Sequence, residues 1–305
     1  MTYIVTGANG FIGAALLREL SAAGEKIYAV VRNEKSNIDN IKNLPGVEIV
    51  CCDMAQIDHL PEMLSGVHAD CLIHLAWAGT SGDSRADYEM QLLNIKYALD
   101  TVDVSAKMGI RRFVGAGTLA EKDVLNYQMD DGATPNAVSI YGIAKLSCQL
   151  MTKAECSKLG MEHLWCHLPN TYGVGNTTNN FVNMAAKKIL GGQRAAFTEA
   201  KQTYDFVYIT DTARAIAAVA RQGKANTAYY LGSGAARPLR QYIEMIRDAI
   251  DPAYSLYFGE VPFNGKSLEA EAYSTDKLYA DTGFEAQVSF EDGIRKTVAW
   301  LKEIM

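Results

Sequence analysis

Apolar and polar residues alternate in two rhythms over the first two thirds of the chain. Short β-rich apolar runs are separated by longer segments whose apolar residues recur at helical spacing, such as Phe11, Leu16 and Leu20. Strands arranged in this way need crossover helices, which gives an α/β fold with a doubly wound parallel sheet covered on both faces. The expected strands are Tyr3–Thr6, Ile27–Val31, Val47–Cys52, Cys71–Ala76, Arg112–Ala116 and His163–Leu168.

The regular alternation of strand and helix patterns ends after Leu168. The segment 169–180 is rich in Asn, Gly and Thr, which indicates a loop. The elements expected beyond it are a helix at Phe181–Leu190, strands at Asp205–Ile209 and Tyr229–Leu231, and helices at Asp211–Ala220, Leu239–Ile250 and Phe290–Ile304. We therefore expect a first domain over 1–168, with sheet additions from about 204–232, and a smaller mixed α/β lobe over 169–305 that is interleaved with it.

The composition limits the partners that the chain can bind. Its 305 residues are 49% hydrophobic and 21% charged, with a formal net charge of −6 and no Lys/Arg-rich run, which argues against nucleic acid or an anionic membrane surface. The sequence enters a strand at once and contains no apolar segment of the roughly 20 residues that a membrane span requires. We expect a cytoplasmic protein. Its six cysteines form no CxxC pair, which favours buried, reduced thiols.

A glycine-rich turn follows the first strand and opens a helix. It reads Thr6-Gly7-Ala8-Asn9-Gly10-Phe11-Ile12-Gly13. Glycines in such a turn let the backbone approach a pyrophosphate, and the helix N-terminus supplies N–H groups and a positive dipole. The turn predicts a Rossmann-type dinucleotide-binding domain; a merely tight β–α turn is the alternative.

The end of the second strand bears on the choice of dinucleotide. An NAD site usually presents a carboxylate there to the ribose hydroxyls, whereas this chain has Arg32, with Lys35 nearby. A guanidinium can clamp a 2′-phosphate, which favours NADP(H). NAD(H) remains possible if Arg32 is only a solvated residue at the strand end. Asp53, which ends the third strand, is placed to reach the adenine amino group.

Tyr141 and Lys145 are four residues apart in a predicted helix, so they share one face. A free tyrosine has a pKa of about 10, and a neighbouring ammonium would favour the phenolate. The pair is a candidate for proton transfer beside a bound nicotinamide ring.

Several motifs in this order resemble the extended short-chain dehydrogenase/reductase family, also called the NAD-dependent epimerase/dehydratase family. The resemblance extends over nearly the whole chain. It is carried by the glycine turn, Cys52-Asp53-Met54, His74-Leu75-Ala76, Asn94, Tyr141 with Lys145, Leu168-Pro169-Asn170-Thr171-Tyr172-Gly173 and Tyr204-Asp205-Phe206-Val207-Tyr208.

The resemblance implies roles for particular residues. The catalytic Ser/Thr of the family corresponds to Thr118, which would hold the reacting oxygen beside Tyr141. The implied cofactor contacts are Gly7, Asn9, Gly10, Phe11, Ile12, Gly13, Arg32, Asp53, Met54, Leu75, Ala76, Trp77, Tyr141 and Lys145. The implied substrate contacts are Thr118, Asn170, Phe181, Asp205 and Tyr208. An arginine that the family carries just before Asn170 is missing here, where Cys166 and His167 stand.

In the family that the chain resembles, three reaction types use the residues equivalent to Thr118, Tyr141 and Lys145. The 4,6-dehydratases follow their catalytic Thr with Asp-Glu, but Leu119 and Ala120 stand here, which argues against dehydration. Arg32 favours a reductase that uses NADPH on a nucleoside-diphosphate 4-keto-6-deoxyhexose; an NAD-dependent nucleotide-sugar 4-epimerase is the alternative. A non-catalytic NADP-binding regulatory protein is the alternative of a different class, although such proteins tend to lose the Tyr/Lys pair.

Two further expectations concern metals and assembly. His163, Trp165 and His167 share one face of a strand while Cys166 points away, so these side chains do not converge on a metal. In the family that the chain resembles, the helices equivalent to 87–104 and 141–154 often pair between subunits, so we expect a homodimer.

Overall fold

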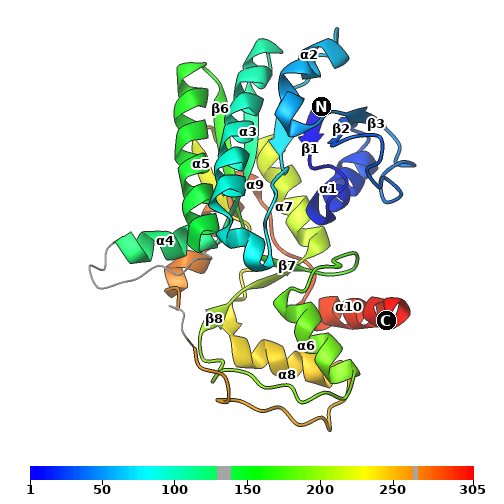
Figure 1. The fold of residues 1–305 in the computed structure, drawn as a ribbon, viewed down its shortest axis with the longest axis vertical. Coiled ribbons are helices and arrows are strands. Elements are labelled where there is room, and N and C mark those ends of the chain that lie inside the picture. The colour runs from blue at the N-terminus through cyan, green and yellow to red at the C-terminus, as the bar shows by residue number, and fades with distance from the viewer. Residues whose placement is uncertain (129–138, 264–266) are drawn as a thin grey trace.

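The computed structural model describes residues 1–128, 139–263 and 267–305 (Figure 1). Its centre is a seven-stranded sheet in the order β10-β6-β5-β4-β1-β2-β3, in which every neighbouring pair is parallel. The strands are β1 (Thr2–Thr6), β2 (Lys26–Val31), β3 (Val47–Cys51), β4 (Cys71–His74), β5 (Arg112–Thr118), β6 (Glu162–Leu168) and β10 (Thr227–Tyr230). The predicted doubly wound α/β fold is confirmed.

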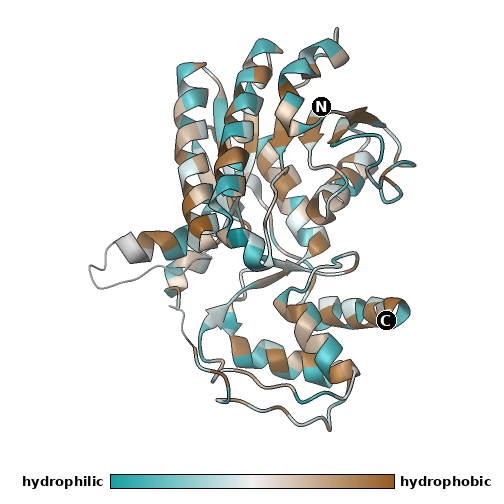
Figure 2. Cartoon of the chain, viewed as in Figure 1, coloured by the Kyte–Doolittle hydropathy of each residue, from teal (hydrophilic) through white to brown (hydrophobic). Residues whose placement is uncertain are grey.

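Helices cover both faces of this sheet because successive strand residues point to opposite sides. In β1, Tyr3 and Val5 pack in the core under α1 (Phe11–Ala22) and α7 (Ile209–Gln222), whereas Ile4 packs in the core under α3 (Tyr88–Lys107) and α5 (Ser139–Lys158). The short elements η1 (Met54–His59) and α2 (Leu60–Met63) join the second face. Figure 2 shows hydrophobic and hydrophilic residues mixed along α3 and α5.

The second lobe has a separate apolar core, which lies beyond the carboxyl ends of the strands (Figure 1). It is built on α6 (Phe181–Leu190), α8 (Leu239–Asp248) and α10 (Phe290–Ile304). Two small sheets join it: β7 (Asn170–Tyr172) with β9 (Phe206–Tyr208), and β8 (Thr203–Tyr204) with β11 (Arg237–Pro238). The remaining elements are α4 (Ala120–Gln128), η2 (Gly82–Ala86), η3 (Ala270–Tyr273) and α9 (Asp276–Thr282).

Three details differ from the expectations. The stretch around Asp205 adds nothing to the main sheet, because β8 and β9 pair with β11 and β7; only β10 is added from the region 204–232. Helix α4 was not expected at all. Cys51 is exposed, because β3 is an edge strand with β2 as its single neighbour, while the other five cysteines are buried.

The order of the strands creates a crevice. From β1 the chain runs outward to β2 and β3 and then returns to β4 on the other side of β1. At such a switch point the loops after the two central strands diverge, and ligands of open α/β sheets bind there. No helix in the described part of the chain is long and apolar enough to cross a bilayer.

Candidate active site

The glycine turn lies at this crevice and leaves no room for side chains. Gly7 has φ +67°, and a Cβ there would lie 2.8 Å from the backbone nitrogen of Ala76, which follows β4. A Cβ on Gly13 would lie 2.3 Å from the carbonyl oxygen of Gly7. Helix α1 therefore packs directly on the turn, and its N-cap, Gly10, has no capping side chain. The turn and the first residues of α1 therefore form a cradle of backbone groups without a capping side chain, at a helix N-terminus, which suits a dinucleotide phosphate.

A cavity of ≈ 380 Å³ opens at the cradle. Its walls come from the turn, from the ends of β4, β5 and β6, and from α5. They comprise Gly7, Gly10, Phe11, Ile12, Gly13, Leu75, Trp77, Thr80, Ser81, Ala116, Gly117, Thr118, Tyr141, Lys145, Leu168, Pro169, Thr171, Asn176, Thr178 and Asn180. We call it the glycine-turn cavity. Its position, at the glycine turn and at the ends of the parallel strands, is where dinucleotides bind in sheets of this kind.

The three residues predicted as catalytic meet at the wall of this cavity. Thr118 ends β5, and Tyr141 and Lys145 lie in the first turns of α5. Tyr141 is 8% exposed and Lys145 is 4% exposed. The Lys145 ammonium donates a hydrogen bond to the carbonyl oxygen of Ala116 over 2.6 Å, and it lies 3.7 Å from the centre of the Trp77 ring.

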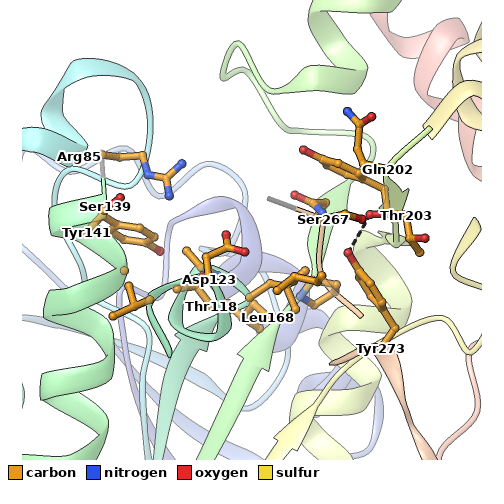
Figure 3. Close-up of a pocket in the computed structure, with 18 of the residues that line it drawn as sticks. Arg85, Thr118, Asp123, Ser139, Tyr141, Leu168, Gln202, Thr203, Ser267 and Tyr273 are labelled. Atoms are coloured by element: carbon orange, nitrogen blue, oxygen red, sulfur yellow. Dashed lines mark hydrogen bonds between the residues drawn. The ribbon is translucent and has the colours of Figure 1, made fainter. Parts of the chain in front are cut away.

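A second cavity, of ≈ 420 Å³, lies between the sheet and the smaller lobe (Figure 3). Its walls are mostly polar, and they include Arg85, Asp123, Ser139, Asn170, Gln202, Thr203, Tyr204, Ser267 and Tyr273. We call it the lobe cavity. Thr80, Thr118, Tyr141, Leu168 and Pro169 line both cavities. Thr118 and Tyr141 therefore stand at the boundary, where two bound molecules could meet.

The Tyr141 phenol is in its neutral form at this boundary. Burial raises its pKa to about 12, and the charge of Glu121 adds to this effect. The charge of Arg85 and a hydrogen bond with Thr118 act in the opposite direction. A neutral phenol can donate a proton to an oxygen in the lobe cavity.

A buried carboxyl, that of Glu121, is hydrogen-bonded to the backbone of Thr118. Glu121 is 1% exposed and accepts hydrogen bonds from the backbone N–H of Thr118 over 2.6 Å and from the Trp165 indole over 3.1 Å. Its other neighbour is His167, whose Nδ1 lies 3.5 Å away. Burial raises the pKa of Glu121 to about 7, against the Thr118 hydrogen bond and the positive charge of Lys145.

The remaining residues expected to bind the cofactor lie outside the walls of the glycine-turn cavity. Asn9 donates to the carbonyl of Asn37, and the Asp53 carboxylate caps η1 by accepting from Ala55. Arg32 is exposed at the end of β2. Met54 packs against the apolar core near η1, and Ala76 donates its backbone N–H to Thr6 over 3.3 Å.

The expected substrate residues divide into two groups. Thr118 and Asn170 line the lobe cavity. Phe181 instead stacks on Phe206 in the core of the smaller lobe, and Tyr208 faces a different hollow, beside α1. Asp205 is fully buried and accepts hydrogen bonds from Tyr230 and Ser233. Its carboxylate is occupied within the fold, so the structure does not bring it to the cavity.

Two charged residues of the lobe cavity were missed from the sequence. Arg85 lies in η2, in the loop after β4, and Asp123 lies one turn into α4, after β5. Burial raises the pKa of Asp123 to about 6, and the charge of Arg85 opposes the rise. Neither residue stands in a recognisable motif, so no signal in the sequence marked them as site residues. Asp123 also places a carboxyl in the cavity although Leu119 and Ala120 follow Thr118.

The ring of His163, in β6, contacts neighbouring side chains of the fold. The His163 ring nitrogen Nε2 lies 3.0 Å from the Thr152 hydroxyl, and the ring stacks on Trp165. No group of three or more potential metal ligands occurs in the described residues.

Comparisons with known proteins agree with this geometry. The chain is 23% identical to a dTDP-glucose 4,6-dehydratase of Streptomyces griseus, over 97% of this chain and 93% of that protein. It is 30% identical to a dTDP-6-deoxy-L-talose 4-dehydrogenase (NAD(+)) of Aggregatibacter actinomycetemcomitans, over 48% of this chain and 52% of that protein. A solved UDP-glucuronic acid 4-epimerase of Bacillus cereus, in complex with a UDP-sugar and NAD, superposes with a TM-score of 0.81, at 19% identity and over 100% of both chains.

The profile of one family matches residues 3–232, which include the ends of β4, β5 and β6 and the helix that carries Tyr141 and Lys145. The match includes the glycine cradle and the residues at the boundary of the two cavities. The chain is an enzyme that belongs to the NAD-dependent epimerase/dehydratase family.

Proposed function

We propose that the enzyme is an NAD(P)-dependent oxidoreductase that acts on a nucleoside-diphosphate sugar, with NADPH reduction of a 4-keto-6-deoxyhexose as its reaction. One observation carries the proposal: Thr118 and Tyr141 line both the glycine-turn cavity and the lobe cavity. A hydride donor in the first cavity and a ketone in the second would meet at these two side chains. The dinucleotide, when bound, supplies the hydride.

The protein's own groups then handle the oxygen and the proton. The neutral Tyr141 phenol donates its proton to the oxygen of the carbonyl that is being reduced, and solvent later restores that proton. The Thr118 hydroxyl holds the same oxygen. Lys145 contributes a buried positive charge to the wall of the glycine-turn cavity, and Asn170 lines the sugar side. Such preorganised donors stabilise the charge that develops on the oxygen.

The choice of NADP(H) rests on Arg32 and Lys35, both of which are exposed after β2. The turn that carries them is closed by Asn33, which donates its backbone N–H to Ser36 and accepts from the backbone of Lys35. Two cations on a formed turn at this strand end suit a 2′-phosphate.

An NAD-dependent nucleotide-sugar 4-epimerase is the second candidate. It is favoured by the relative of known structure named above, which is in complex with NAD.

The test combines retention of the cofactor with turnover. The purified enzyme is assayed with NADPH and NADH against a panel of nucleoside-diphosphate sugars and their 4-keto forms, alongside Tyr141→Phe. We expect NADPH oxidation by the parent, and a loss of at least about 100-fold in Tyr141→Phe with dinucleotide binding retained. Normal turnover in Tyr141→Phe would contradict the mechanism. Firmly retained NAD, recycled without net oxidation, would identify the epimerase.

We also propose that the enzyme is a homodimer paired through α3 and α5. These helices pack on one another and leave large apolar side chains in solvent. Leu92 on α3 is 61% exposed and Leu150 on α5 is 59% exposed, with Tyr88, Ile143 and Met151 nearby on the same two helices. Tyr88 and Leu92 are one turn apart on α3, and Ile143 and Leu150 are two turns apart on α5, so each helix presents exposed apolar residues on one side, which is typical of a protein interface.

A further inference from the structure

Arg85 is held in place by its neighbours. It lies in η2, and two buried side chains of α3 hold the loop that leads to it. Gln91 donates to the carbonyl oxygens of Gly79 and Ser84 over 3.0 and 3.2 Å and accepts from the Trp77 indole over 2.8 Å. Asn94 exchanges two hydrogen bonds with the backbone of Ala78. These hydrogen bonds attach the loop to α3, and Arg85 extends from it.

The Arg85 side chain faces the phenol. Its guanidinium carbon lies 4.7 Å from the centre of the Tyr141 ring. Its Nε is buried and has no hydrogen-bond partner in the described part of the chain. Figure 3 shows Arg85, Tyr141 and Asp123 directed into the lobe cavity from the sheet side, with Thr203, Ser267 and Tyr273 opposite.

Lys145, the cation expected to act on Tyr141, is engaged elsewhere. Its ammonium donates to the Ala116 carbonyl and lies over the Trp77 ring. The charged groups that act on the phenol are Arg85 from η2 and Glu121 from α4, whereas Asp123 and Lys145 line the cavities beside it. Of these, Arg85 has the strongest effect in lowering the pKa of Tyr141, against burial and the charge of Glu121.

We propose that Arg85 is a positioning residue that serves the reaction through Tyr141, holding a positive charge against the phenol so that it can bear negative charge once its proton has left. When Tyr141 protonates the substrate oxygen, a buried phenolate remains, which would be costly without a nearby cation. A guanidinium stays protonated throughout this step. The inference rests on the proposed function, because the phenol must act as a proton donor.

The first test measures Tyr141 without any substrate. A fluorotyrosine placed genetically at position 141 gives a fluorine NMR signal whose shift reports ionisation, and its phenol is more acidic than that of tyrosine. In Arg85→Gln we expect the titration midpoint to rise by about one pH unit, since a lost neighbouring cation disfavours the charged form. Arg85→Lys should restore most of the shift. An equal midpoint in Arg85→Gln and the parent would overturn the proposal.

Arg194 provides the matched control. Its guanidinium carbon lies 3.7 Å from the centre of the Tyr257 ring, and its side chain is 60% exposed and pairs with Glu260. Neither Arg194 nor Tyr257 lines the lobe cavity. Arg194→Gln therefore removes a comparable cation–ring contact and should leave the reporter's midpoint where it was.

The second test uses turnover. Arg85→Gln should lower kcat by up to about tenfold, the factor that corresponds to one pKa unit when proton transfer is fully expressed in the rate, with dinucleotide affinity unchanged. A shifted midpoint with an unaltered kcat would also overturn the proposal. If the parent enzyme turns over none of the sugar nucleotides, the proposed function fails, while the fluorine titration still decides the relationship between Arg85 and Tyr141.

Discussion

The backbone N–H of Thr118 donates a hydrogen bond to the buried carboxyl of Glu121, 2.6 Å away. Burial raises the pKa of Glu121 to about 7, so this carboxyl titrates close to neutral pH. Thr118, which is proposed to hold the reacting oxygen, is therefore hydrogen-bonded to a group whose charge changes near neutral pH. The same carboxyl accepts from the Trp165 indole. Its protonation links the stability of the site to pH.

This link predicts how stability changes with pH. A carboxyl whose pKa is raised by folding binds more protons in the folded than in the unfolded state, so its contribution is complete below about 4.5 and is lost as the pH rises through about 7. Relative to Glu121→Gln, the parent should lose up to about 1.4 kcal/mol of unfolding free energy per pH unit in that window. Urea unfolding at a series of pH values measures it. Exposed Glu62→Gln is the control, and parallel curves for the parent and Glu121→Gln would refute the prediction.

Replacing Gln91 should destabilise the loop that carries Trp77 and Arg85. Gln91 is 1% exposed, and Gln91→Leu keeps its size but leaves the Trp77 indole and two carbonyls without their partner. Unsatisfied buried groups cost about 1–3 kcal/mol each, so we expect a loss of at least about 2 kcal/mol by chemical denaturation. Gln241→Leu, at an exposed position on α8, is the control. A loss no larger than that of the control would show that the loop is held by other contacts.

The proposed dimer predicts that charges on the α3/α5 face separate the subunits. Leu92→Glu with Leu150→Glu should shift the mass measured by light scattering from twice the chain mass to the chain mass, because each carboxylate would otherwise be buried. Met184→Glu places a charge at an exposed apolar position on α6, in the other lobe, and should have no effect. A parent protein that is already monomeric would contradict the proposal.

The sequence was sufficient where a feature depends on local periodicity. The main strands and helices follow from spacings of 2 and 3.6 residues, and Tyr141 and Lys145 share a face because they are one helical turn apart. The glycine turn was visible because a close backbone approach at Gly7 and Gly13 admits no other residue type.

Long-range pairing was not available from the sequence. Asp205 stands in a motif that suggested substrate contact, but Tyr230 and Ser233, which are remote in the chain, enclose its carboxylate. The opposite occurred with Arg85 and Asp123, which have ordinary polar surroundings in sequence. They became site residues only because η2 and α4 both pack at the end of α5.

Arg32 provides the prediction that separates NADP(H) from NAD(H). The residue is exposed after β2 and can reach a 2′-phosphate only through charge-assisted hydrogen bonds, which are worth about 1.5–3 kcal/mol each. Arg32→Asp removes them and places a repelling carboxylate there, so the Kd for NADPH should rise at least about tenfold. The affinity for NADH should improve, because the new carboxylate can accept from the ribose hydroxyls. Arg295→Asp makes the same change of charge at an exposed site on α10 and should leave both affinities unaltered. Calorimetric titration of both dinucleotides measures the ratio, and equal ratios in Arg32→Asp and the parent would show that Arg32 takes no part in the choice of cofactor.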